Sequence, residues 1–308
     1  MKKTIFITGS SGLIGSHFIK KFNVDYKIYR LSNNKKLKYN RDYIYLDYLD
    51  KEEIKILIQQ IGIPDYFLHF GWGKMESPHS EYHIKENIHG ARNLLQEFSK
   101  KGLKKFIFLG SINEYGKSFN KHPFKESQKK SYKLRNYERG KIKFSKYALE
   151  YVRGKKTKYI HVRLCNIFGL IKKKESLIYT IHKSFYLKKY LRVSSLDNYR
   201  DLLYVDDATR GIKEIMINVD SSKIINLGSG QSILMKDFVK IYWQLLGGSE
   251  EKIKFGNIKN SKKNTEQTLN HMDITLLKKN INWKKPFNIK KNIKSNIKAY
   301  KTIYRSIK

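Results

Sequence analysis

Apolar residues occur with two spacings along the first half of the chain. Short runs rich in β-branched and aromatic residues stand at 4–7, 26–30, 43–46 and 105–109. Runs of this length and type are typical of strands buried in a parallel sheet. A longer segment from about 81 to 101 keeps its apolar residues on one helical face, namely Ile84, Ile88, Ala91, Leu94, Leu95 and Phe98. The pattern therefore predicts strands that alternate with helices.

The first of these strands is followed at once by three regularly spaced glycines. Gly9, Gly12 and Gly15 form a G-x-x-G-x-x-G pattern, and the apolar residues after them keep roughly helical spacing. At a turn from strand to helix, such glycines permit a tight bend, let a pyrophosphate approach the backbone, and let helix and strand pack closely. The helix N-terminus adds free N–H groups and a positive dipole end. We therefore predict dinucleotide contacts at Gly9, Ser11, Gly12, Leu13, Ile14 and Gly15.

The end of the second expected strand bears on the choice between NAD and NADP. An NAD site usually carries Asp or Glu there, about 20 residues beyond the glycines, to bind the ribose 2′-OH. This chain has Arg30 at that end, followed by Ser32, Asn33, Lys35 and Lys36. Because an arginine suits a 2′-phosphate, the sequence favours NADP. The alternative is chance, since 64 of the 308 residues are Lys or Arg.

A serine, a tyrosine and a lysine follow in an order that indicates acid–base chemistry. Ser111 closes the strand expected at 105–109, Tyr137 stands 26 residues further on, and Lys141 follows it by four. Residues four apart share one face of a helix, so the phenol and the ammonium should point the same way. Tyr-x-x-x-Lys alone is uninformative in a chain with 22 tyrosines. Its place after a glycine turn and a strand-end serine is what predicts that Ser111, Tyr137 and Lys141 are catalytic.

The chemistry expected of these residues is proton transfer at a substrate oxygen, matched to hydride transfer at the carbon. Tyr137 would be the acid or base, which requires its pKa to fall from about 10 toward about 7. Three pKa units correspond to roughly 4 kcal/mol of preferential phenolate stabilisation. The Lys141 ammonium and a positive nicotinamide ring would supply it as nearby opposite charge. Ser111 would hydrogen-bond the substrate oxygen and orient it.

These motifs together resemble the extended branch of the short-chain dehydrogenase/reductase family, in the group that modifies nucleotide-activated sugars. Further segments carry the likeness: Asp65-x-x-x-His69-x-Gly71, Arg163-x-x-Asn166-x-x-Gly169, and Arg200-Asp201 with Asp206-Asp207. The resemblance runs from Thr4 to about Pro286. It implies an α/β fold with a doubly wound, Rossmann-like parallel sheet and a small C-terminal lobe. Residues 1–165 plus about 200–228 would form the dinucleotide-binding core, and about 166–199 and 229–308 the substrate-binding lobe.

The resemblance also implies cofactor contacts at Asp47, Tyr48, Phe70 and Gly71, and at the catalytic Tyr137 and Lys141. The acidic residue after the third strand would contact the adenine amino group, and the loop after the fourth would run under the cofactor. Asp50 and Glu53 have the spacing of a capping box at the start of the next helix. The two interpretations are compatible, because Asp47 and Asp50 can divide the roles.

On the substrate side the resemblance implies contacts from Ser111, Asn113, Asn166 and Arg200. The Arg200 guanidinium would lie near the substrate diphosphate, for which it offers bidentate donors. The aspartates of the same segment would cap the following helix. Family members often carry a second diphosphate-binding arginine upstream of Asp273, but residues 262–272 contain none. The helix at 81–101 would either help form a homodimer or pack in the core.

The net charge of +37 would suit a binder of nucleic acid or of an anionic surface. The excess is spread from Lys2 to Lys308, however, and accompanies much Asn, Ile and Tyr, which share A/T-rich codons. We interpret it as compositional drift and expect no specific nucleic-acid partner. A side effect would be that anionic nucleotides are drawn to the protein.

The sequence also bears on where the protein is located and on whether it binds a metal. The single cysteine, Cys165, rules out an intramolecular disulfide and a thiol metal cluster, and no metal is expected. The apolar start of the chain breaks at Thr8-Gly9, too early for a signal peptide. Nothing approaches the length of a membrane span. We therefore expect a cytoplasmic protein with no membrane span.

The residues beside Ser111 narrow the reaction. In dTDP-glucose 4,6-dehydratases this position is followed by Asp-Glu, whereas this chain has Ile112 and Asn113, neither of which can move a proton. Glu114 is one residue further, and strand alternation would point its side chain away from that of Asn113. Dehydratase activity of that type is therefore not expected.

The leading hypothesis is an NADPH-dependent reductase of a 4-keto-6-deoxy nucleotide sugar, serving surface polysaccharide synthesis. Arg30, the missing acid pair and a likeness of Gly110–Gly116 to reductases of this group favour it. The alternative is a nucleotide-sugar 4-epimerase with tightly held NAD. The alternative from another class is a non-catalytic NADP-binding or RNA-binding relative, and the intact catalytic trio argues against a sensor.

Overall fold

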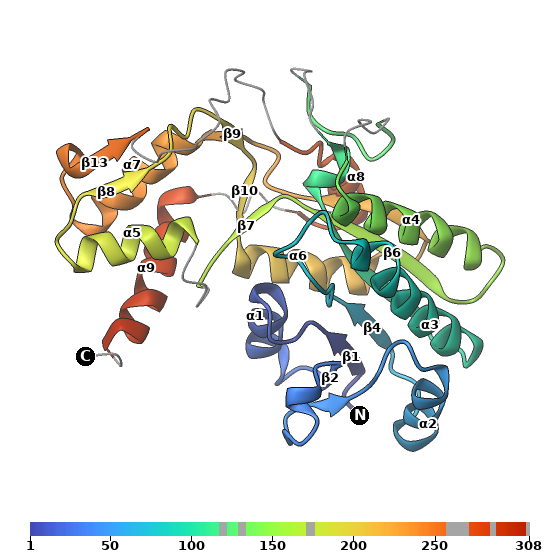
Figure 1. Cartoon of the computed structure of the whole chain (residues 1–308). Helices are drawn as coiled ribbons and strands as arrows, with labels where there is room; N and C mark the ends of the chain where they lie inside the picture. Colours follow the sequence, from blue (N-terminus) through green and yellow to red (C-terminus); the bar gives the residue numbers. More distant parts are fainter. Residues whose placement is uncertain (117–121, 129–133, 171–175, 257–270, 284–287, 306–308) are drawn as a thin grey trace.

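The computed structural model describes residues 1–116, 122–128, 134–170, 176–256, 271–283 and 288–305. Its centre is a seven-stranded parallel sheet in the order β11-β6-β5-β4-β1-β2-β3. Four of these strands, β1, β2, β4 and β6, are labelled in Figure 1. The strands are β1 (Thr4–Thr8), β2 (Lys27–Ser32), β3 (Ile44–Tyr45), β4 (Tyr66–His69), β5 (Lys105–Ser111), β6 (Lys158–Leu164) and β11 (Lys223–Leu227). The parallel α/β architecture expected from the sequence is confirmed.

The strand order reverses at β1. From there the sheet grows through β2 and β3 on one side, and through β4, β5, β6 and β11 on the other. The connections that follow β1 and β4 therefore leave in opposite directions. In open α/β sheets a ligand crevice lies at such a switch point, outside the carboxyl ends of the strands.

Helices cover both faces of the sheet. One face carries α1 (Leu13–Phe22) and α6 (Val205–Asn218), and the other carries α2 (Lys51–Ile61), α3 (Glu86–Lys100) and α4 (Asn136–Tyr151). Alternate residues of β1 point to opposite faces, so Ile5 and Ile7 enter the first core and Phe6 enters the second. All three are fully buried. The doubly wound arrangement is thus confirmed.

Strand β2 ends at Ser32, two residues beyond the expected end at Arg30. Leu31 is fully buried and pairs with Thr8 of β1 on one side and with Ile44 of β3 on the other. Burial of this apolar side chain extends the strand past Arg30. The expectation that Arg30 closes the second strand is therefore wrong.

Helix α3 begins at Glu86 rather than near 81, because a 3₁₀ turn, η2 (Glu81–His83), precedes it. The remaining 3₁₀ turns are η1 (Lys35–Leu37), η3 (Ile112–Tyr115) and η4 (Glu250–Lys252). The apolar stripe of α3, including Ile88 and Leu94, is buried inside the chain. Of the two uses expected for this stripe, the structure shows core packing.

A third apolar cluster lies beside the sheet, at the left of Figure 1. It is built from α5 (Leu177–Tyr186), α7 (Met235–Leu246) and α9 (Ile289–Arg305), with the strand pair β8 (Leu191–Val193) and β13 (Ile253–Phe255). Two further pairs join β7 (Asn166–Phe168) to β10 (Leu202–Tyr204) and β9 (Tyr199–Arg200) to β12 (Ile233–Leu234). In the described part of the chain no helix, α9 included, has the length and apolarity needed to cross a membrane.

The segment 271–283 returns to the main sheet. Helix α8 (Thr275–Asn280) contacts β11. Met272, Leu277 and Trp283 join the core on the face of the sheet that carries α1 and α6. The Trp283 indole N–H also donates to the Gly228 carbonyl at 3.3 Å. This segment falls within the range that the sequence assigned to the lobe, yet its side chains pack with the core.

Candidate active site

The glycine turn between β1 and α1 has the geometry that its sequence predicts. Gly9 adopts a φ of 66°. A Cβ on Gly9 would lie 2.6 Å from the Gly71 nitrogen, and one on Gly15 would lie 2.3 Å from the Gly9 oxygen. Helix α1 begins at Leu13 with Gly12 as its N-cap, so its unpaired first amides and positive end stand at the turn. A backbone cradle free of side chains suits the diphosphate of a dinucleotide.

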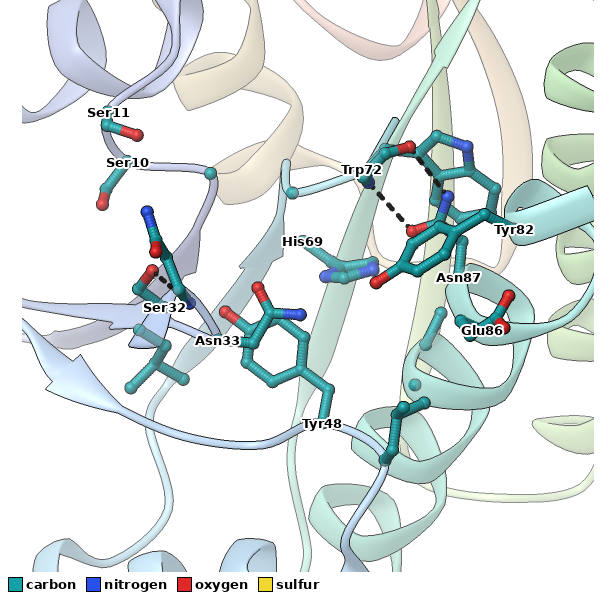
Figure 2. A pocket seen from close by; sticks show the side chains of 18 of the residues that line it. Ser10, Ser11, Ser32, Asn33, Tyr48, His69, Trp72, Tyr82, Glu86 and Asn87 are labelled. Atoms are coloured by element: carbon teal, nitrogen blue, oxygen red, sulfur yellow. Dashed lines mark hydrogen bonds between the residues drawn. The ribbon is translucent and has the colours of Figure 1, made fainter. Parts of the chain in front are cut away.

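A cavity opens beside this turn at the carboxyl edge of the sheet (Figure 2). Its lining comes from the glycine turn, the end of β2, the loops after β3 and β4, and the start of α3; it includes Ser10, Ser11, Ser32, Asn33, Tyr48, Gly71, Glu86 and Asn87. The Tyr48 phenol hydrogen-bonds the backbone at Asn33, which joins two of these segments. Among the described residues that line the cavity there is no lysine or arginine, and Glu86 is its one carboxylate.

Arg30 lies elsewhere. Its side chain is half-buried, and its guanidinium stands 5.9 Å from the centre of the Tyr43 ring. Ser32 and Asn33 occupy the strand end that the sequence assigned to Arg30, and they line the cavity. The preference for NADP depends on an arginine at the end of β2, and the structure does not place Arg30 there.

Of the other expected cofactor contacts, Tyr48 and Gly71 line the cavity, whereas Asp47 and Phe70 do not. The Asp47 carboxylate accepts from the Leu49 amide at 2.9 Å. Phe70 lies half-buried against Phe18, with ring centres 6.1 Å apart. Both side chains are thus engaged with the protein, although each adjoins a residue that faces the cavity.

The capping of α2 differs in one partner from the expected box. Asp50 accepts from the Glu52 and Glu53 amides, as an N-cap should. The Glu53 carboxylate, however, accepts from the Asp47 amide at 2.8 Å rather than from that of Asp50. It therefore fixes the loop that carries Asp47 and Tyr48.

Thr8 ties the ends of β1 and β4 together. Its hydroxyl accepts from the Gly71 amide at 2.9 Å and lies 2.8 Å from His69 Nδ1. Burial, with the Lys141 charge, lowers the pKa of His69 to about 3, so this imidazole is neutral at physiological pH. These bonds hold the loop after β4 against the glycine turn.

The three predicted catalytic residues lie together at the same edge of the sheet. Ser111 ends β5, and Tyr137 and Lys141 stand one turn apart on α4, 7% and 4% exposed. The Tyr137 phenol hydrogen-bonds the Ser111 side chain. Lys141 Nζ lies 5.4 Å from the centre of the Tyr137 ring and donates to the Leu109 carbonyl at 2.7 Å. A substrate hydroxyl that reaches Ser111 would therefore meet a phenol and an ammonium in one place.

The electrostatics of Tyr137 differ from the expectation. Burial raises the pKa of its phenol, and the Glu114 carboxylate raises it further, while the hydrogen bond with Ser111 acts in the opposite direction. Burial lowers the pKa of Lys141 to about 8, against the effect of Glu114. The residues of this chain therefore do not by themselves hold the phenol acidic, because desolvation and a like charge outweigh the nearby ammonium.

Sequence reasoning missed a second group that packs against these residues. The Trp72 ring centre lies 4.6 Å from Lys141 Nζ, and the Trp72 indole N–H donates to His83 Nδ1 at 3.1 Å. The His83 ring stands edge-on to that of Tyr137, with 5.5 Å between centres. Asn87 accepts from the Gly73 amide at 2.9 Å and so fixes the loop. The signal available was Trp72 itself, a large side chain directly after the expected cofactor loop.

The segment after Ser111 is a 3₁₀ turn, η3, rather than a continuing strand. Ile112 and Glu114 are consequently buried, and Asn113 is exposed. The expected divergence of Asn113 and Glu114 is observed, but its cause is the 3₁₀ turn and not strand alternation. Ser111 caps this turn by accepting from the Asn113 amide at 3.2 Å.

The two expected substrate residues of the second half are also brought together. Arg200 donates from Nη1 to the Asn166 side-chain oxygen at 3.1 Å, and Asn166 donates from Nδ2 to the Asp201 carbonyl at 3.2 Å. Arg200 is exposed, so its remaining donors are available to a ligand. The stretch 262–270, where a second arginine is missing from the sequence, lies outside the described residues.

The aspartates near Arg200 do not act as helix caps. Asp201 is fully buried and accepts from the Ser229 amide and hydroxyl at 2.9 and 2.7 Å. Asp206 and Asp207 stand inside the first turn of α6, whose N-cap is Tyr204. There they complement the helix dipole, and Asp207 pairs with Arg210 at 2.7 Å. The expectation that they cap α6 is wrong.

A doubly wound parallel sheet, a glycine turn after its first strand, and serine, tyrosine and lysine gathered at its carboxyl edge define a nicotinamide-dependent enzyme of the short-chain dehydrogenase/reductase type. The model of the NAD dependent epimerase/dehydratase family matches residues 5–228, and the chain belongs to that family. The chain is therefore an enzyme of the epimerase and dehydratase type.

Known proteins agree with this assignment. The chain is 23% identical to ADP-L-glycero-D-manno-heptose-6-epimerase of Brachyspira hyodysenteriae, over 77% of this chain and 78% of that protein. UDP-glucose 4-epimerase of Thermotoga maritima has the same fold, with a TM-score of 0.83 and 20% identity over 98% and 99% of the two chains. The structure of dTDP-glucose 4,6-dehydratase of Bacillus anthracis, solved with NAD, matches with a TM-score of 0.81 and 18% identity over 97% of each chain.

Proposed function

We propose that the protein is a nucleotide-sugar 4-epimerase that retains NAD and inverts a hydroxyl-bearing ring carbon by oxidation and return of the same hydrogen. The observation that carries the proposal is the buried pair Tyr137 and Lys141 beside Ser111, with no acid at positions 112 and 113. Such a site can move one proton at a carbinol oxygen. It lacks the acid pair that a 4,6-dehydratase of the dTDP-glucose type uses to eliminate water.

Each residue of the site has a role in this reaction. The Ser111 hydroxyl would hold the substrate oxygen against the Tyr137 phenol, with which it already shares a hydrogen bond. Tyr137 would take the carbinol proton and later return it, and Lys141 would favour the phenolate by opposite charge. The bound nicotinamide ring supplies the hydride acceptor and donor and, when oxidised, a positive charge. That charge fits a site in which burial and Glu114 otherwise raise the pKa of Tyr137.

The cavity beside the glycine turn favours NAD over NADP. A 2′-phosphate requires a cation at the end of β2, and Ser32 and Asn33 offer only a hydroxyl and an amide there. A ribose with a free 2′-OH can hydrogen-bond either side chain. The Gly9 and Gly15 positions, where a Cβ would meet backbone, leave the space that a diphosphate needs.

The substrate would lie between the catalytic residues and the third apolar cluster. Arg200, held by Asn166, is suited to the nucleotide diphosphate. In this proposal residues 1–165 and about 200–228 bind the cofactor, and the segments around 166–199 and beyond 229 shape the sugar site. A homodimer would use the exposed faces of α3 and α4, since the apolar stripe of α3 is buried in the chain.

A second candidate is a reductase of a 4-keto-6-deoxy nucleotide sugar. The likeness of Gly110–Gly116 to reductases of this group favours it, and the catalytic trio serves either reaction. The two candidates differ in cofactor use. An epimerase recycles its bound NAD, whereas a reductase consumes one reduced cofactor for each turnover.

The test begins with the cofactor that co-purifies with the full-length protein, extracted and identified by mass spectrometry. The protein is then incubated with UDP-glucose or UDP-N-acetylglucosamine in D₂O without added cofactor. We expect retained NAD and formation of the 4-epimer with no deuterium at C4, because the hydrogen never exchanges with solvent. Oxidation of added NADPH by a 4-keto-6-deoxy nucleotide sugar would instead establish the reductase. No reaction in either assay would contradict both candidates.

A further inference from the structure

A carboxylate that takes no part in the proposed proton transfer accepts a hydrogen bond from the backbone amide of Ser111. Glu114 is fully buried. Its Oε1 accepts from the Ser111 amide at 2.9 Å and lies 3.1 Å from His161 Nε2, and its Oε2 accepts from Arg163 Nε at 3.0 Å. An ionised carboxylate in such a site is held only when its hydrogen bonds and charge are matched. Glu114 has both.

His161 links Glu114 to α4, the helix that carries Tyr137 and Lys141. It is fully buried on β6, and its Nδ1 lies 2.6 Å from the Ser145 hydroxyl. Ser145 stands on α4, one turn after Lys141 and two turns after Tyr137. Three hydrogen bonds, through Glu114, His161 and Ser145, therefore join the Ser111 turn to the helix that holds the phenol and the ammonium.

The backbone is shaped to admit these contacts. A Cβ on Gly110 would lie 2.0 Å from His161 Nε2 and 2.4 Å from Glu114 Oε1. No side chain fits there without displacing the His161–Glu114 contact. The glycine before Ser111 is therefore a requirement of the contact between the carboxylate and the imidazole.

The charge of Glu114 is present at neutral pH. Burial raises the pKa of Glu114, but the hydrogen bond with His161 and the charges of Arg163 and Lys141 outweigh burial and hold that pKa below its usual range. Burial lowers the pKa of His161, against the effect of Glu114. The imidazole is then a neutral donor to the carboxylate, and Arg163 is its counter-ion.

We propose that Glu114, His161 and Ser145 form a positioning network that fixes Ser111 against helix α4 and holds an ion-paired carboxylate behind the serine that Tyr137 contacts. This inference rests on the proposed role of Tyr137 as the acid and base. The charge disfavours the phenolate while the nicotinamide ring is reduced and neutral. With the cofactor bound, the phenol would keep its proton beside a reduced, neutral ring and would release it more easily beside an oxidised, positive one, so the proton on Tyr137 would follow the redox state of the cofactor.

The groups that face Tyr137 come from four elements. Glu114 faces it from η3, Ser111 from β5 and His83 from η2. On α4 it is flanked by Lys141 and by Glu138, the latter ion-paired with Arg135 at the start of the helix. Both carboxylates are ion-paired, Glu114 with Arg163 and Glu138 with Arg135. Glu114 has the larger effect on the pKa of Tyr137 and also holds the Ser111 amide, so it is the one to vary.

The test places 3,5-difluorotyrosine at position 137 of the full-length protein and follows its single ¹⁹F resonance against pH, without substrate. Glu114→Gln removes the charge but keeps the shape and should lower the titration midpoint by about one unit or more. The matched control is Glu97→Gln, a carboxylate of similar burial on α3 that pairs with Lys100, and it should leave the midpoint unchanged. An unchanged or raised midpoint in folded Glu114→Gln would overturn the proposal.

His161→Phe gives a second measurement, in which the titration midpoint of residue 137 should not fall. Its ring would lie among Phe108, Tyr159 and the neighbouring aromatic side chains, so the variant should fold. It removes a donor but leaves the carboxylate, so the midpoint should hold or rise; a fall would overturn the proposal even if Glu114→Gln does not fold. Since the titration needs no turnover, a wild-type protein inactive on nucleotide sugars would refute the proposed function alone.

Discussion

The ammonium of Lys141 lies 4.6 Å from the centre of the Trp72 ring system. The same Nζ donates to the Leu109 carbonyl, so the cation is enclosed between an indole face and the main chain. An aromatic face attracts a cation, most strongly where water is excluded. Trp72 thus helps a buried lysine, whose pKa burial lowers to about 8, to keep its charge near neutral pH.

Trp72→Leu should lower turnover near neutral pH by about 3- to 30-fold, since a desolvated cation–π contact contributes about 0.5–2 kcal/mol. Trp72→Phe keeps a ring and should lose less. The alkaline limb of the pH–rate profile should move to lower pH in the leucine variant, because Lys141 then loses its proton more easily. Equal losses in both variants, with no movement of that limb, would mean that Trp72 acts by packing alone.

Tyr137→Phe should lower turnover by about 100-fold or more, the usual contribution of a positioned acid or base, while the protein keeps its cofactor. Tyr147→Phe is the matched control, because Tyr147 lies on the same helix and its hydroxyl accepts from Gln96 instead. Steady-state kinetics and extraction of bound cofactor measure the two properties separately. Comparable activity in the two variants would refute the catalytic role.

Gly9→Ala should abolish cofactor retention. The new Cβ would lie 2.6 Å from the Gly71 nitrogen, and the loop after β4 would have to move away from the glycine turn. Gly102→Ala is the control, because Gly102 shares the positive φ but faces open space. It should cost only the backbone strain, about 1 kcal/mol, and retain the cofactor. Mass spectrometry of the extracted nucleotide decides between the outcomes.

Asn33→Arg should shift cofactor preference toward NADP. The residue lines the cavity where β2 ends, and a guanidinium there can bind a 2′-phosphate bidentately. We expect the ratio of the NADP and NAD dissociation constants to change by about tenfold or more, whereas Arg30→Gln should leave it unchanged. A loss of NADP binding in Arg30→Gln would restore the role that the sequence gave to that arginine.

The stability of the protein should fall as the solution becomes acidic. His69 has a pKa of about 3 when folded, against 6.5 for an ordinary histidine, so between these values the unfolded state binds more protons. This contribution is complete above pH 6.5 and is lost as the pH falls below it, by up to about 1.4 kcal/mol per pH unit. Denaturant unfolding at pH 7, 6 and 5 measures the slope. His69→Asn, which cannot titrate, should show a shallower slope.

The local signals in the sequence were sufficient for much of the site. The glycine turn and the i, i+4 pairing of Tyr137 with Lys141 depend on residues close in the chain, and the structure has both. The sequence also placed Ser111 at the carboxyl end of a strand, which predicts that it lies near the glycine turn. In a parallel sheet all such ends lie on one edge.

The errors came from tertiary effects. Arg30 was displaced from the strand end because Leu31 pairs on both sides in the core, which a propensity argument does not register. Glu114 meets His161 only because β5 and β6 are neighbours in the sheet. The elevated pKa of Tyr137 likewise depends on burial and on a carboxylate from another element. None of these leaves a periodic trace in the sequence.

The buried carboxylate of Asp201 joins three separate stretches of backbone. It lies between β9 and β10, accepts from Ser229 and Gly230 after β11, and accepts from the Met272 amide before α8. The chain passes between the sheet and the third apolar cluster near each of these stretches. One buried carboxylate thereby fixes, relative to one another, three stretches of backbone that are far apart in the sequence.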